Sequence, residues 1–132
     1  MRYLTHLVFL ALLCGCTVSN HNLNEGPNHL GGGFSDSKVA SGIFWISAQT
    51  NFAPWSDFEA ARKMFKLRAT ELCGSDNFLP LKMIEKELDH IPRDLPPRYI
   101  LSQVSGYVVC ESSDYTFEEV ERLIQLSIDE DV

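Results

Sequence analysis

The chain has 132 residues, of which 45% are hydrophobic, and it carries a formal net charge of −7 at neutral pH. This length suffices for one compact domain with a core of modest size. The negative charge argues against nucleic acid as a partner, because such binding relies on clustered Lys and Arg side chains. From Glu111 onward, the chain has eight acidic residues and one basic residue, Arg122. A solvated acidic surface and a docking surface for a basic partner both fit this distribution.

The first 15 residues have the layout of an export signal. Arg2 and the free amine precede an apolar run that ends at Leu13, and this run is much shorter than the about 20 residues that span a bilayer. The junction Leu13-Cys14-Gly15-Cys16 resembles a bacterial lipobox. That resemblance implies a signal peptide over residues 1–15 and a diacylglycerol on the thiol of Cys16, which would hold the chain to membrane lipid. An ordinary cleaved signal is the competing interpretation.

The residue after the lipobox cysteine bears on the destination. Bacterial lipoproteins that lack aspartate at this position are usually sorted to the outer membrane, and Thr17 stands there. The resemblance therefore implies a lipid-anchored protein of the outer membrane that faces the periplasm. An inner-membrane location and display on the cell surface stay open.

The cysteine count agrees with a lipobox. Processing would remove Cys14, and acylation would use Cys16. Cys73 and Cys110 then remain as an even pair, which an oxidising compartment is expected to join. Closing this loop is worth roughly 3 to 4 kcal/mol in the chain-entropy model.

The mature chain divides into a tether and one domain. Residues 16–33 are rich in Asn, Gly, Ser and His and lack apolar periodicity, so they predict a lipidated, flexible tether before a domain over residues 34–132. Gly42 to Thr50 is rich in aromatic and β-branched residues and predicts a strand. Both faces of its first half are apolar, so one face is covered by the core and the other by core or by a partner.

A long helix is predicted from about Asp57 to Cys73. Ser56 is placed to cap it, Glu59 would complete a capping box, and Gly74 ends it. An apolar stripe at helical spacing predicts the face that packs on the sheet: Phe58, Ala61, Phe65, Ala69 and Leu72.

The second half of the domain is less uniform. Asn77 to Ile84 fits either a strand or the start of a short helix, and the proline-rich residues 91–97 predict a loop. Arg98 to Cys110 predicts a long strand, with Gly106 at a bulge or a close backbone approach. A final helix is predicted from Phe117, capped by Thr116 with Glu119 in the box position.

Catalytic and metal-binding patterns are weak in this sequence. His21 and His29 fall in the expected tether and His90 in the expected loop, without ligand-spaced partners, so we expect no metal and no cofactor. A small hydrolase would need His90 beside a nucleophile such as Ser102 or Ser105, and no nucleophile motif surrounds either serine. We therefore expect no enzyme.

Two segments carry a resemblance beyond the lipobox. Gly32-Gly33-Phe34-Ser35-Asp36, followed by Ala60-Ala61 and then Arg68-Ala69-Thr70-Glu71-Leu72-Cys73, resembles a group of small Gram-negative lipoproteins of unknown function. That group opens with Gly-Gly-Tyr-Ser-Asp/Glu and has an Arg-Ala-Ala-Glu-Leu helix. This chain departs by Phe34 for Tyr, by Thr70 for Ala, and in the segment after Gly74. The resemblance implies membrane anchorage and a small α+β domain, and it supplies no active site.

The sequence thus predicts an α+β domain with a small antiparallel or mixed three-stranded sheet, one long helix across it, a C-terminal helix and one disulfide. The leading hypothesis is a non-enzymatic binding or assembly module of the cell envelope with an envelope protein as partner. Ile43, Trp45 and Tyr107 are the candidate contact face, weighed against a role in the core. An envelope stress or redox sensor is the second hypothesis, and a small hydrolase is the third.

Overall fold

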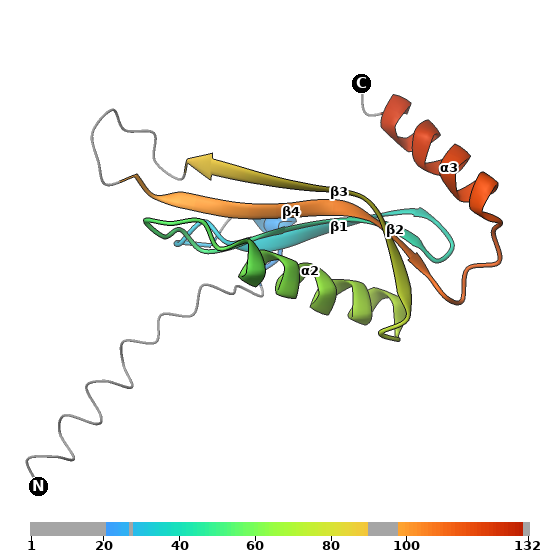
Figure 1. Cartoon of the computed structure of the whole chain (residues 1–132), viewed down its shortest axis with the longest axis horizontal. Helices are drawn as coiled ribbons and strands as arrows, with labels where there is room; N and C mark the ends of the chain where they lie inside the picture. Colours follow the sequence, from blue (N-terminus) through green and yellow to red (C-terminus); the bar gives the residue numbers. More distant parts are fainter. Residues whose placement is uncertain (1–20, 27, 90–97, 131–132) are drawn as a thin grey trace, which may run out of the picture.

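The computed structural model describes residues 21–26, 28–89 and 98–130. These residues form a single antiparallel sheet with the strand order β1-β2-β4-β3. Helix α2 lies along one face of the sheet, and helix α3 stands at one end of the other face (Figure 1). The elements in chain order are the short 3-10 helix η1 (Leu23–Glu25), β1 (Gly33–Ala40), β2 (Ile43–Gln49), α2 (Phe58–Cys73), β3 (Phe78–Asp89), β4 (Ile100–Cys110) and α3 (Phe117–Glu130).

The expected α+β class and the disulfide are confirmed, but the sheet has four strands and not three. The strand that was not predicted is β1, which pairs with β2 from Gly33 opposite Gln49 to Ala40 opposite Ile43. Its sequence lacks the alternation of apolar and polar residues that predicts a strand. β1 is an edge strand whose side chains are mostly only partly buried or exposed. Gly42, at a φ of 73°, allows the tight turn into β2.

Residues 21–26 and 28–33, which were expected in a flexible tether, contact the sheet in the structure, while residues 16–20 and 27 lie outside the described part. The backbone N–H of Phe34 donates to the carbonyl of His21 at 2.7 Å, and Asn22 forms a parallel bridge with Phe34. The side chain of Asn28 accepts the N–H groups of Leu30 and Gly32 at 2.8 and 3.0 Å. The ordered domain therefore includes His21 and does not begin at Phe34.

Close packing explains why residue 32 is a glycine. A Cβ on Gly32 would lie 2.7 Å from the backbone nitrogen of Asn51 and 2.9 Å from the carbonyl carbon of Thr50. No larger residue fits without a backbone shift. Composition alone suggested a tether, because Gly and Asn mark flexible chains and tight turns equally well.

The helix α2 begins one residue later than predicted. Its N-cap is Asp57, whose carboxylate accepts the N–H of Ala60 at 3.0 Å, and so the predicted capping box of Ser56 and Glu59 is wrong. The backbone N–H of Asp57 donates to Ser102 Oγ on β4 at 2.7 Å, which sets the direction of the chain at this residue. The hydroxyl of Ser56 bonds Glu87 on β3 instead. The helix ends as expected at Gly74, which is in the left-handed conformation.

From Phe78 onward, the ambiguous segment Asn77 to Ile84 belongs to the edge strand β3. A bulge between Leu81 and Ile84, with Lys82 at a φ of 50°, explains the helix-like spacing of its apolar residues. Because of the bulge, Leu81, Ile84 and Leu88 all lie on the same face of the sheet despite their spacing. The close approach predicted at Gly106 is confirmed, because a Cβ there would meet the sulfur of Met83. The predicted loop at 91–97 lies outside the described residues.

The core lies in two layers, one on each face of the sheet. The layer between α2 and the sheet is the larger and consists of Ile46, Ala48, Ala61, Met64, Phe65, Ala69, Val104 and Val108. The smaller layer lies beneath α3 and consists of Ile43, Tyr107, Val120 and Ile124. Helix α3 thus depends on few buried side chains for its attachment.

The predicted capping box of α3 is confirmed. The backbone N–H of Thr116 donates to the carboxylate of Glu119 at 2.8 Å, and the N–H of Glu119 donates to the hydroxyl of Thr116 at 3.4 Å. The hydrogen bonds from Thr116 lower the pKa of Glu119 from its usual value. These bonds start the helix where the chain leaves the loop after β4.

Candidate functional site

A cleft of about 350 Å³ lies between α3 and the β1–β2 side of the sheet. Four elements, β1, β2, β4 and α3, supply the residues that line it, namely Ser37, Lys38, Val39, Trp45, Tyr107, Ser127 and Glu130. Two of the three predicted contact residues, Trp45 and Tyr107, are among them. We regard this cleft as the candidate functional site.

The expected exposed contact face of Ile43, Trp45 and Tyr107 is wrong for two of its members. Ile43 is fully buried and Tyr107 is only 8% exposed, because α3 covers both with Val120 and Ile124. Trp45 is partly buried and lines the cleft. A contact through Trp45 stays a prediction.

The sheet register sets the geometry of the cleft. Ser37, Trp45 and Tyr107 are directly opposite one another on β1, β2 and β4, so their side chains form a row on one face. The hydroxyl of Tyr107 lies 3.2 Å from Ser127 Oγ on α3, and Ser127 also donates to the carbonyl of Ile124. This contact holds one wall of the cleft against the sheet.

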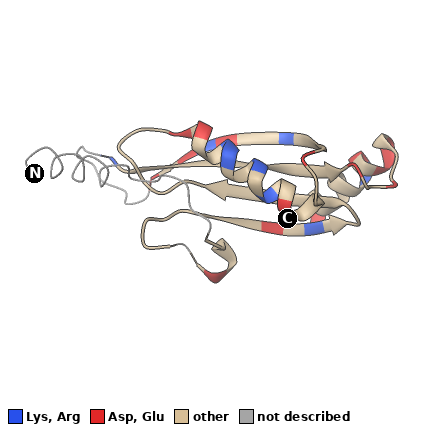
Figure 2. Cartoon of the chain, turned by 90° about the horizontal axis from the view of Figure 1, so that it is seen from below, with Lys and Arg blue, Asp and Glu red and all other residues tan. Residues whose placement is uncertain are grey.

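Charge is distributed unevenly around the molecule. Basic residues follow α2, and acidic residues gather on α3 at one end of the sheet (Figure 2). The last turn of α3 carries Asp129 and Glu130, and Glu130 lines the cleft. The cleft combines two aromatic rings, hydroxyl groups, the ammonium of Lys38 and the carboxylate of Glu130. The aromatic ring of Trp45 and the acidic end of α3 suit a ligand with both apolar and cationic parts.

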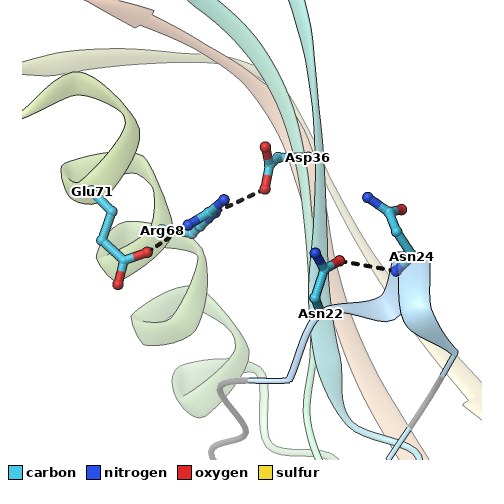
Figure 3. Close-up of polar contacts among 5 residues, drawn as sticks. All are labelled: Asn22, Asn24, Asp36, Arg68 and Glu71. Carbon is cyan, nitrogen blue, oxygen red and sulfur yellow. Dashed lines mark hydrogen bonds and ion pairs between the residues drawn. The ribbon is translucent and has the colours of Figure 1, made fainter.

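The structure also joins the two segments that carry the family resemblance. Arg68 on α2 lies between Asp36 on β1 and Glu71 on α2 (Figure 3), and it donates to their carboxylates at 2.8 and 2.7 Å. The carbon at the centre of its guanidinium lies 4.6 Å from the centre of the Phe34 ring. Phe34 and Asp36 of the opening motif thus both contact Arg68 of the helix motif, and Arg68 also bonds Glu71.

The Arg68 contacts connect β1 to the helix that covers the sheet. Burial lowers the pKa of Arg68, but its hydrogen bonds to Asp36 and Glu71 outweigh this effect and raise the pKa overall, so the side chain stays charged. The arrangement accounts for the two motifs as one structural contact. Both of its carboxylates, Asp36 and Glu71, are bonded to Arg68.

The residues considered for catalysis are not brought together in the described part of the chain. Ser102 and Ser105 lie on opposite faces of the sheet, and Ser102 is fully buried. His90 lies outside the described residues, and His21 bonds the carbonyl of Gly26 at 2.7 Å. Across residues 21–26, 28–89 and 98–130, no group of three His, Cys, Asp or Glu side chains could hold a metal ion.

Sequence reasoning missed the cleft residues Ser37, Ser127 and Glu130. The helical spacing of Phe117, Val120, Ile124 and Ile128 predicts a packing face for the C-terminal helix, but it does not show where on the sheet that face docks. Only the register of β1, β2 and β4 places Ser37 beside Trp45.

Comparison with known proteins gives no match. No protein-family model matches the chain, and no curated protein and no solved structure is similar to it. Within the described residues, no helix is long and apolar enough to cross a membrane.

Proposed function

We propose that this protein is a lipid-anchored, non-enzymatic binding module of a Gram-negative cell envelope, and that its cleft binds a basic segment of an envelope partner. The observation that carries this proposal is the cleft between α3 and the β1–β2 side of the sheet. Trp45 offers an aromatic surface for an aliphatic or cationic side chain, and Glu130 offers a carboxylate to a Lys or Arg. The acidic residues of α3 would attract such a partner before contact.

Membrane anchorage through Cys16 rests on the cysteine pattern. The disulfide between Cys73 and Cys110 uses the two cysteines outside the lipobox, as an exported domain would. Of the four cysteines, one is lost with the signal peptide in this proposal, and Cys16 alone is left to carry the lipid. Residues 1–20 lie outside the described part, so the support comes from the sequence and from the disulfide.

Fatty-acid labelling in cells tests the anchor. Growth with a radioactive fatty acid should label the wild-type chain, and the Cys16→Ser variant should carry no label because it lacks the acylated thiol. The control is Cys73→Ser, which loses the disulfide but keeps the lipobox and should be labelled. Equal labelling of the wild type and Cys16→Ser would contradict the anchor.

Site-directed crosslinking in intact cells tests the cleft. A photoreactive phenylalanine analogue in place of Ser37, which is exposed and lines the cleft, should give a crosslinked partner. The same analogue in place of Lys66, which is exposed on α2 on the other face of the sheet, is the matched control and should not give that partner. Adding Glu130→Lys to the Ser37 variant should weaken the crosslink by reversing a charge.

Two results of this experiment would contradict the cleft proposal. The first is the same partner captured from both positions, which would indicate nonspecific contact. The second is no loss of crosslinking with Glu130→Lys, which would exclude a basic segment as the ligand.

A further inference from the structure

One end of the sheet carries exposed apolar side chains that the proposed cleft does not use. We call it the entry end, and it consists of the described residues 21–26, 28–33, 50–57 and 98–102. β1 and β4 run in the same direction, because each is antiparallel to β2, and so Gly33 and Ile100 begin their strands at this same end. Helix α3 lies at the opposite end (Figure 1).

Trp55 and Leu30 are the exposed apolar residues of the entry end. Trp55 is 62% exposed, although a tryptophan normally buries most of its ring. It lies between Ala53, which pairs with Ile100, and Asp57, which bonds Ser102, so both sides of its loop are fixed to the start of β4. Trp55 is therefore exposed even though its loop is held to β4 on both sides.

Leu30 lies in the neighbouring turn. It is 47% exposed, and its carbonyl accepts the N–H of Phe52 at 2.9 Å, which joins its turn to the loop that carries Trp55. Phe52 in turn packs edge-to-face against Tyr99, with ring centres 5.1 Å apart. The two exposed side chains thus lie on adjacent loops, and the loop of Trp55 is held in place by the packing of Phe52 against Tyr99.

The N-terminal segment reaches the domain at this end. Because the bridge between Asn22 and Phe34 is parallel, residues 21 and 22 run along β1 in its own direction, and they come from the end where β1 begins. Cys16 is five residues before His21 in the sequence. A span of five residues extends at most about 18 Å, at about 3.6 Å per residue.

We propose that the entry end rests on the phospholipid bilayer, with Trp55 and Leu30 in its interfacial layer. This inference rests on the proposed lipid anchor at Cys16. A short link keeps the entry end at a high effective concentration near the lipid, so a small apolar contact suffices for docking. Tryptophan is the side chain that favours the membrane interface, because its ring is apolar and its N–H is polar.

The charge of the opposite end agrees with this orientation. Helix α3 carries most of the acidic excess of the domain, and an anionic lipid surface would repel it (Figure 2). With the entry end on the bilayer, α3 and the cleft point away from the membrane. The cleft then faces partners in the space beyond the lipid surface.

The two tryptophans of the chain allow a matched test on vesicles. The chain from Cys16 onward, with its disulfide formed, has one free thiol and can be coupled to a maleimide-headed lipid in phosphatidylethanolamine–phosphatidylglycerol vesicles. The variant Trp45→Phe keeps only Trp55, and Trp55→Phe keeps only Trp45. Trp45 is opposite Tyr107, which is about 23 Å along β4 from Ile100 at about 3.3 Å per residue.

Lipids with brominated acyl chains should quench the two variants differently. We expect a roughly twofold loss of Trp55 emission, with a shift to shorter wavelength, because its ring lies at the interface. Trp45 should show no loss. Leu30→Ser in the Trp45→Phe background should reduce the quenching of Trp55, because it removes the neighbouring apolar contact.

Absence of Trp55 quenching, or equal quenching of both tryptophans, would overturn the proposed orientation. Because the lipid is attached chemically, the result does not depend on lipidation in cells. Equal fatty-acid labelling of the wild type and Cys16→Ser would overturn the anchor alone. The two failures are therefore distinguishable.

Discussion

Replacing Cys73 and Cys110 together by alanine should lower the free energy of unfolding by about 4 kcal/mol. The disulfide closes a loop of 37 residues and joins the end of α2 to the end of β4, with 5.3 Å between the two Cα atoms. Without it, the unfolded chain gains the entropy of an open loop. For a domain of this size, the loss corresponds to a fall in melting temperature of roughly 15 to 30 °C.

Urea denaturation of the wild type and the double alanine variant measures this effect. The single variant Ser112→Ala, an exposed position close to Cys110, is the control and should match the wild type. A loss below 1 kcal/mol in the double variant would contradict the expected contribution.

The ease with which the Cys73–Cys110 bond is reduced distinguishes a structural disulfide from a redox sensor. Cys110 is only 4% exposed and Cys73 is partly buried, so a reductant thiolate has limited access to the bond in the folded state. We expect mild reductant to leave the folded protein oxidised and to reduce it only with urea present. Ready reduction of the folded protein would favour the sensor hypothesis over a structural role.

Replacing Arg68 by alanine should lower the free energy of unfolding by about 2 kcal/mol. The side chain donates to Asp36 and Glu71 and stacks on Phe34, and both members of the Arg68–Asp36 pair are three-quarters or more buried. Its removal would leave the Asp36 carboxylate without its cation in a partly buried position. Arg68→Lys should recover little, because an ammonium cannot match the planar contacts of a guanidinium.

A double-mutant cycle of Arg68→Ala and Asp36→Asn isolates the pair from the rest of the motif. The matched control is Arg62→Ala, which removes an ion pair with Glu85 between α2 and β3. That pair is more exposed, with 57% and 37% of the two side chains accessible, so its loss should cost much less than the loss of Arg68. Equal losses for Arg62 and Arg68 in chemical denaturation would show that the motif contact has no special role.

The elements of the fold differ in how clearly their sequences predict them. α2 was predicted closely because its apolar stripe has one period over four turns and ends at Gly74. β1 was missed because an edge strand with polar side chains lacks that signal. β3 was ambiguous because its bulge changes the period from two to three within the strand, and this shift depends on Gly106 in the neighbouring strand.

The candidate site was predictable only in part. Trp45 and Tyr107 were selected for their apolar character, and both line the cleft. The extent of their burial depends on α3, whose docking position is a tertiary property. The contact of Arg68 with Asp36 likewise joins segments 32 residues apart, and neither segment by itself indicates an ion pair.

The sequence by itself determined the α+β class, the main helices and the pairing of Cys73 with Cys110, because periodicity, caps and cysteine parity are local or countable properties. The tertiary structure alone decided three things. It placed β1 at a sheet edge, it packed residues 28–33 against the sheet through the tight contact at Gly32, and it put α3 over Ile43 and Tyr107 to form the cleft. Each of these depends on which elements pack against one another, and the local sequence pattern of one element does not specify its packing partner.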